Sequence, residues 1–199
     1  MNYDEITKSE FNNNTIIEYG IIKGNSIVVF IKVGQDGSIY GYENKYLIVA
    51  QKLNKKYGYS VIVSSNPFDG NNPLEHDMNF VREYCMRNKI NDYEVYFIGH
   101  SNGARIGISW GYQYTEIKKM LLINSPLFIN WHILKKGIQQ SQNQEMLLIY
   151  GNRDNSYKYV GLLEPLLDDN KKLIIIDGAD HNFTNMLDKF IELPLFYFK

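Results

Sequence analysis

The feature that most constrains the fold is an alternation, along the whole chain, of short apolar runs rich in β-branched residues with longer amphipathic stretches. This alternation is typical of parallel βαβ units, in which helices cover both faces of one sheet. After the first two runs, strands are expected at Ser60–Ser64, Glu94–Ile98, Met120–Ile123, Met146–Tyr150 and Lys172–Ile176, and helices at about 43–56, 74–89, 102–114, 129–138, 157–168 and 184–192. No linker or repeat interrupts the pattern, so we expect a single α/β domain over residues 1–199.

The first two apolar runs differ from the rest because no helical stretch separates them. Ile16–Ile22 and Ser26–Val33 are joined only by Lys23-Gly24-Asn25, and this spacing predicts an antiparallel hairpin. The second run is apolar enough to be buried on both faces of a sheet. We therefore expect a mostly parallel sheet that begins with an antiparallel hairpin.

Composition and charge exclude several classes of protein. Hydrophobic residues make up 44% of the 199 residues and charged residues 22%, values of an ordinary globular chain that needs no disulfide or metal to hold its core. Twenty-one basic residues face 22 acidic ones, so the chain has no overall field that would attract nucleic acid or anionic lipid. We expect no nucleic-acid partner.

The chain start and the single cysteine bear on location. The first residues are polar and acidic, and no apolar run approaches the ~18 residues that span a membrane. Cys85 recurs with Val81 and Tyr84 at helical spacing, so we interpret it as a core residue rather than a reactive thiol. These patterns predict a cytoplasmic protein without a membrane span.

The strongest chemical signal is Gly99-His100-Ser101-Asn102-Gly103, which lies between a predicted strand and a predicted helix. This is the pattern G-x-S-x-G, a tight turn whose glycines remove side chains that would collide with the strand and the helix. The serine hydroxyl then lies at a helix N-terminus, where main-chain N–H groups favour negative charge. The pattern predicts that Ser101 is a nucleophile.

An acid and a base follow at two later strand ends. Asp154 comes just after Met146–Tyr150, and His181 comes after Lys172–Ile176. Because the carboxyl ends of parallel strands meet at one edge of a sheet, we expect both side chains near Ser101, in the chain order serine, acid, histidine. Two other interpretations stay open: Asp154 as the N-cap of the next helix, and His181 as a surface-loop residue.

The remaining titratable residues near these motifs are assigned lesser roles. Asp180 adjoins His181 in sequence, so its side chain projects away from the imidazole. His100 is expected to be buried beside the tight turn. His76 and His132 lack histidine or cysteine partners at helical spacing, so we expect neither a metal site nor a cofactor.

Together, the segments Gly99–Gly103, Gly151–Asp154 and Asp180–Phe183 resemble the α/β-hydrolase superfamily, over about residues 16–192. The resemblance implies that Ser101, Asp154 and His181 are the nucleophile, acid and base of a catalytic triad. Members of this family usually carry His-Gly at the end of the third strand, where this chain has Val33 and Gly34.

The same resemblance implies an oxyanion hole. Its donors would be the main-chain N–H groups of Gln35 and Asn102. The alternative interpretation of Gly34-Gln35-Asp36-Gly37 is a plain turn, and the segment fits neither a dinucleotide nor a P-loop phosphate motif.

The interval between Ile123 and Met146 is too short for the lid of several helices that many relatives carry. We therefore expect a pocket built from strand-end loops, with Tyr40, Phe68, Phe128 and Trp131 as substrate-binding residues. The predicted function is that of a serine hydrolase acting on ester or thioester bonds of small to medium acyl substrates. Amide cleavage, acyl transfer on the same triad, and a non-catalytic binding module with this fold remain as alternatives.

Overall fold

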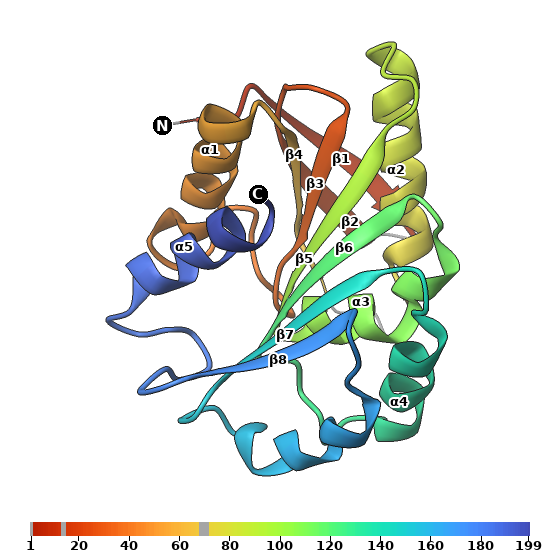
Figure 1. Ribbon diagram of the computed structural model, residues 1–199. Coiled ribbons are helices and arrows are strands. Elements are labelled where there is room, and N and C mark those ends of the chain that lie inside the picture. The colour runs from red at the N-terminus through yellow and green to blue at the C-terminus, as the bar shows by residue number, and fades with distance from the viewer. Residues whose placement is uncertain (1, 13–14, 68–71) are drawn as a thin grey trace.

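The computed structural model describes residues 2–12, 15–67 and 72–199, which form one sheet with helices on both faces (Figure 1). The strands are β1 (Glu5–Phe11), β2 (Thr15–Ile22), β3 (Ile27–Lys32), β4 (Ser60–Ser64), β5 (Glu94–His100), β6 (Ile117–Ile123), β7 (Glu145–Gly151) and β8 (Lys171–Ile176). The α-helices are α1 (Lys45–Tyr57), α2 (Leu74–Arg87), α3 (Asn102–Trp110), α4 (Trp131–Gln140) and α5 (Leu187–Tyr197). Short 3-10 segments are η1 (Tyr42–Asn44), η2 (Gly111–Gln113), η3 (Tyr157–Leu162) and η4 (Glu164–Leu166).

The strand order in the sheet is β1-β2-β4-β3-β5-β6-β7-β8. Strand β2 is antiparallel to both β1 and β4, while β3 to β8 run parallel to one another. The chain passes from β3 outward to β4 and then returns to β5 on the other side of β3. Such a reversal of strand order opens a crevice at the carboxyl ends of the strands on either side of it, here β3 and β5.

The expected class of sheet is confirmed, but the predicted partner of Ile16–Ile22 is wrong. This run pairs with β1 and β4 instead of β3, which lies beyond β4. The connection Lys23-Gly24-Asn25 does not form a tight hairpin, because it crosses the start of β4: the Gly24 N–H donates to Ser60 Oγ, and Ser60 Oγ donates to the Asn25 carbonyl. Strand β3 is thereby free to take two parallel neighbours, as its burial on both faces requires.

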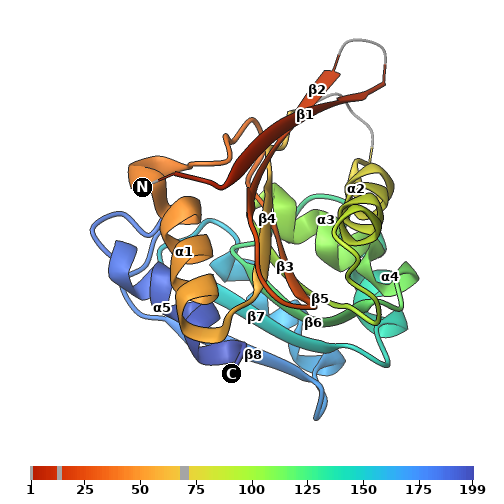
Figure 2. The same ribbon diagram turned by 90° about the horizontal axis from the view of Figure 1, so that it is seen from above.

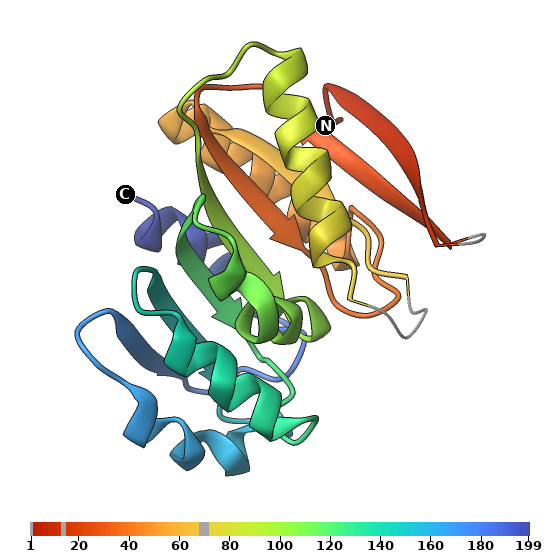
Figure 3. The ribbon, with the colours of Figure 1, turned by 90° about the vertical axis from the view of Figure 1, so that its right-hand side faces the viewer.

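The helices form two layers, one on each side of the sheet. Helices α1 and α5 cover one face, and α2, α3 and α4 cover the other (Figures 2 and 3). Alternate residues of β3 belong to the two hydrophobic cores, one on each face of the sheet. Val28 and Phe30 face α2, α3 and α4, while Val29 and Ile31 face α1 and α5. Cys85 of α2 is buried in the larger core, as its spacing predicts, and burial raises the pKa of its thiol to about 11.

The segment between β6 and β7 belongs to this helical layer and is not a lid. Its helix α4 buries Leu134 and Ile138 and packs on α3 so closely that a methyl group at Gly137 would collide with the Ile108 carbonyl. The expectation that no large lid is present is therefore confirmed.

The helix predicted at 157–168 is wrong. The chain forms η3 and η4 there, and Pro165 lacks the N–H that a continuous helix would need. Among the helices of the described part of the chain, none is long and apolar enough to cross a bilayer.

Candidate active site

Ser101 occupies the turn between β5 and α3 in a backbone conformation that L-residues rarely adopt, with φ 55° and ψ −122°. The two glycines of the motif make this turn possible. A Cβ at Gly99 would lie 2.5 Å from Ala104 Cα, and one at Gly103 would collide with the Lys32 carbonyl oxygen. Only glycine at both positions lets the helix lie this close to β3 and β5, so the turn presents the serine at the carboxyl edge of the sheet.

Ser101, His181 and Asp154 form a continuous chain of hydrogen bonds. Ser101 Oγ lies 2.8 Å from His181 Nε2, and His181 Nδ1 lies 2.5 Å from Asp154 Oδ2. Because a carboxylate only accepts, Nδ1 carries the proton toward Asp154, and Nε2 is left to accept from the serine hydroxyl. The structure thus brings together the three residues predicted from separate strand ends.

Asp154 does not cap a helix, since the next helical segment, η3, has Ser156 as its N-cap. Asp154 Oδ1 accepts the Ser156 N–H at 2.6 Å, while Oδ2 contacts the imidazole. The carboxylate side chain is only 1% exposed, against 43% for the His181 side chain. The bond to Ser156 fixes the carboxylate in the orientation that meets His181.

The loop that carries His181 is held by a residue that the sequence analysis missed. Asn124, fully buried after β6, donates through Nδ2 to the Asp180 and His181 carbonyls at 3.1 and 3.0 Å. Its Oδ1 accepts the Gly151 N–H at 2.9 Å, which ties the loop to the end of β7. A polar residue directly after the apolar run Met120–Ile123 was the signal available in the sequence.

His100, the residue before Ser101, is buried as predicted and joins the tight turn to the histidine loop. Its Nε2 lies 2.9 Å from the His181 carbonyl, and its Nδ1 lies 2.8 Å from Tyr46 Oη. Burial, with a smaller contribution from nearby Lys45, holds the pKa of His100 well below its usual value. The ring is therefore neutral, donating from Nε2 to the carbonyl and accepting at Nδ1 from the Tyr46 hydroxyl.

The loop after β3 lies against Ser101. A Cβ at Gly34 would stand 3.3 Å from Ser101 Cβ and 3.8 Å from Ser101 Oγ. The Gly34 main chain bonds to the Tyr46 hydroxyl, which partly offsets the rise that burial causes in the Tyr46 pKa. No acceptor is found among the described residues for the N–H groups of Gln35 and Asn102, so both donors are available to a ligand.

A cavity of about 290 Å³ opens beside the serine. It is lined by Gly34, Gln35, Gly37, Gly41, Tyr42, Lys45, Tyr46, His100, Ser101, His181 and Asn182. Within the described part of the chain, this lining contains neither an aliphatic side chain nor a carboxylate. Tyrosine rings, main-chain groups and polar side chains form the described lining, with Lys45 as its one lysine or arginine.

The aromatic residues predicted to bind substrate do not line this cavity in the described ranges. Tyr40 packs on Tyr3 with ring centroids 5.6 Å apart. Phe128 is 56% exposed, and Trp131 packs against the core beneath α4. Phe68 lies outside the described residues. The lining comes instead from the ends of β3, β5 and β8 and the loops after them, together with η1 and the start of α1, because the β3–α1 connection folds over the carboxyl end of β3.

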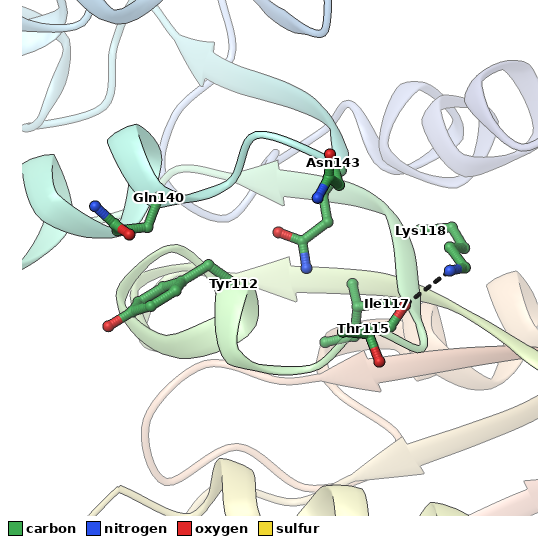
Figure 4. A pocket seen from close by; sticks show the side chains of 7 residues that line it. Tyr112, Thr115, Ile117, Lys118, Gln140 and Asn143 are labelled. Carbon is green, nitrogen blue, oxygen red and sulfur yellow. Dashed lines mark hydrogen bonds between the residues drawn. The ribbon is translucent and has the colours of Figure 1, made fainter.

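A second cavity, of about 180 Å³, lies at the opposite end of the sheet, near the start of β6 (Figure 4). Its lining includes Tyr112, Thr115 and Gln140 and shares no residue with the triad. In the part of the chain that the structure describes, no three His, Cys, Asp or Glu side chains are grouped as metal ligands.

Comparison with known proteins places the fold. No family model and no curated protein matches the sequence. Among solved structures, Est1E from Butyrivibrio proteoclasticus matches with a TM-score of 0.73 and 13% identity, over 94% of each chain. An alpha-beta serine hydrolase homologue from Coxiella burnetii matches with a TM-score of 0.71 and 16% identity, over 97% of this chain and 96% of that one.

XC6422 from Xanthomonas campestris, described as a serine hydrolase without a lid, matches with a TM-score of 0.68 and 16% identity, over 96% of this chain and 93% of that one. At these identities the similarity concerns the fold. The chain therefore has the α/β-hydrolase fold in its lid-less form, as the sequence motifs predicted.

Proposed function

We propose that this protein is a serine hydrolase that cleaves carboxylic ester or thioester bonds of small to medium acyl substrates. The observation that carries the proposal is the hydrogen-bond chain from Ser101 through His181 to Asp154, at 2.8 and 2.5 Å. Esterases and serine hydrolases among the structures of similar fold support the same class of reaction.

In the proposed acylation step, Ser101 Oγ attacks the substrate carbonyl carbon, and its proton passes to His181 Nε2. Asp154 holds the imidazole in the tautomer with Nδ1 protonated and stabilises the imidazolium that forms. The negative charge that develops on the carbonyl oxygen would be met by the N–H groups of Gln35 and Asn102.

Collapse of this intermediate breaks the bond to the leaving alkoxide or thiolate, which takes the proton from His181 Nε2. Water then enters, gives a proton to the same nitrogen and attacks the acyl-enzyme carbonyl. The second collapse releases the carboxylic acid and returns the proton to Ser101 Oγ, which restores the starting state.

The proposal is tested by covalent labelling with a fluorophosphonate probe, followed by peptide mapping. We expect one adduct, on Ser101, and its loss in Ser101→Ala. Ser26→Ala, which removes an exposed hydroxyl in the turn before β3, is the matched control and should label as the unaltered protein does.

Labelling at another residue, or no labelling of the folded unaltered protein, would refute the nucleophile assignment and favour a binding module with this fold. Turnover of paired ester, thioester and amide substrates then decides the bond. A preference for amides, or for acyl transfer to an added alcohol or amine over hydrolysis, would replace the proposed ester and thioester class.

A further inference from the structure

Lys45, the first residue of α1, is a buried cation in the wall of the cavity beside Ser101. The residue is only 3% exposed, which is rare for a lysine unless a partner neutralises it. The Gly41 main chain and the Tyr46 and Phe190 rings surround its stem and head, with the ammonium 5.2 Å from the Tyr46 centroid and 4.6 Å from that of Phe190. Lys45 is therefore held in place by packing.

No carboxylate of the described residues lies within ion-pair distance of the Lys45 ammonium, which lines the cavity. The carboxylate that acts on it from a greater distance is that of Asp180. Asp180 Oδ1 already accepts the N–H groups of Asn182 and Thr184, at 3.1 and 2.8 Å, and so is fixed to its own loop. A cation in a cavity wall without a close carboxylate is open to an anion that is supplied by a ligand.

The charges around the cavity favour an anion as well. Burial lowers the pKa of Lys45 to about 8, so the group is still mainly protonated at neutral pH. Neighbouring His100 is neutral, and no Asp or Glu side chain lines the cavity in the described ranges. Gln35 and Asn182, which also line it, can donate hydrogen bonds from their amides to a carboxylate.

We propose that Lys45 binds a carboxylate of the substrate, so that the preferred substrates are esters or thioesters that carry a carboxylate group in the same molecule. This inference rests on the proposed function, because it places the anion in the cavity that adjoins Ser101. A monoanion fits the single ammonium of the wall, whereas a phosphate dianion would call for further cations that the described lining lacks.

A purely structural role for Lys45 makes a different prediction. If its ammonium only stabilises the rings of Tyr46 and Phe190 or offsets Asp180, replacing it should change the turnover of charged and neutral esters by the same factor. If it binds the substrate carboxylate, the loss should be confined to charged substrates. The ratio of kcat/KM for a charged ester to that for its neutral isostere separates the two roles.

The experiment uses two isosteric pairs on the full chain. p-Nitrophenyl adipate and p-nitrophenyl adipamate place a carboxylate or a neutral amide on the acyl side. p-Acetoxybenzoate and p-acetoxybenzamide place them on the alcohol side. We expect the unaltered protein to prefer the charged member of one pair, and Lys45→Met to lower that ratio by about tenfold. The pair that responds identifies the side of the scissile bond that faces Lys45.

Two further variants complete the test. Lys45→Arg should retain part of the preference, and Lys55→Met, which removes an exposed charge from the same helix, should leave the ratio unchanged. Equal effects of Lys45→Met on both members of both pairs would overturn the inference while leaving the hydrolase intact.

If the protein turns over no ester, the proposed function is refuted, and the carboxylate site is then tested by a binding measurement. Adipate or p-hydroxybenzoate, titrated by ligand-observed NMR, should bind the unaltered protein and Lys55→Met more tightly than Lys45→Met. Equal binding to all three, or binding to none, would overturn the carboxylate site independently of catalysis.

Discussion

The backbone at Ser101 should carry strain that can be measured by comparing Ser101→Gly with Ser101→Ala. At φ 55° and ψ −122° a residue with a Cβ is held in a sparsely populated conformation, which costs about 1–3 kcal/mol. Glycine adopts such angles without that strain but loses about 0.5–1 kcal/mol through the greater freedom of its unfolded chain. We therefore expect Ser101→Gly to be more stable than Ser101→Ala by up to about 2.5 kcal/mol.

The measurement is equilibrium urea unfolding of both variants, followed by tryptophan fluorescence and circular dichroism. Neither variant keeps the hydroxyl, so the comparison isolates the backbone from the chemistry. A difference of 1 kcal/mol corresponds to about 2–4 °C in Tm for a chain of this size. The control pair is Lys52→Gly and Lys52→Ala on the exposed side of α1, where alanine should be the more stable by about 1 kcal/mol. If Ser101→Ala is more stable than Ser101→Gly by as much as in the control pair, the turn is not strained.

Four further predictions concern activity. Asp154→Asn should keep the fold but favour the wrong imidazole tautomer, and so lower kcat by up to about 10⁴-fold. The control variant Asp169→Asn should have no such effect. Near-normal turnover in Asp154→Asn would refute the catalytic role and leave Asp154 only its hydrogen bond to the Ser156 N–H. Tyr46→Phe should lower kcat about tenfold or more, because His100 and Gly34 each lose a buried partner; unchanged kcat and Tm would show that this network is dispensable. Any preference for charged over neutral esters should decline as pH rises through about 8, because Lys45 loses its proton there. Over the same range Asp180 stays charged, since its pKa is lowered mainly by its bond to the Thr184 N–H, and His100 stays neutral. A ratio of kcat/KM values that is constant across this range would contradict the assignment. Finally, kcat/KM for neutral p-nitrophenyl esters should stop rising early in the acyl series, since the described lining of the cavity has no aliphatic side chain to cover a long acyl tail, and each methylene left in water forgoes about 0.8 kcal/mol; a steady rise to palmitate would contradict this description of the cavity.

The proximity of Ser101, Asp154 and His181 could be predicted from the sequence because each lies in the connection that follows a strand. A parallel sheet collects such positions at one edge whatever the order of its strands. The prediction of their proximity was therefore unaffected by the error about which strand pairs with Ile16–Ile22. That error arose because a three-residue connection favours a hairpin locally, while the contacts of Gly24 and Asn25 with Ser60 are long-range.

Strand β1 was not predicted because five of its seven residues, Glu5–Phe11, are polar and none is buried. An edge strand of this kind has a weak apolar pattern, and it is stabilised mainly by pairing with β2. The 3-10 segments at 157–166 were missed for a different reason. Their apolar spacing resembles that of a helix, and only the proline argues against one.

Most of the cavity lining comes from the strand ends and strand-end loops, as predicted, but the described side chains that line it are not the aromatic ones expected. Aromatic abundance pointed to Phe128 and Trp131, whereas the start of α1 supplies Lys45 and Tyr46. Knowing that the β3–α1 connection folds over Ser101 requires the strand order, which places β3 beside β5.

Lys45 departs from the local rules that the rest of α1 follows. The helix macrodipole favours acidic residues in the first turn and basic ones in the last, and α1 does carry Lys55 and Lys56 in its last turn. At its first position, however, it buries a lysine against the positive end of the dipole, with no carboxylate in the first turn to offset it. Both the dipole and the burial disfavour this cation, and a sequence selected for stability alone would place a capping residue or an acid here. The Tyr46 and Phe190 rings beside the ammonium offset part of this cost. Residues that break local rules are expected at functional sites. The proposed substrate carboxylate would offset the rest, since it brings a negative charge to the wall of the cavity beside Ser101.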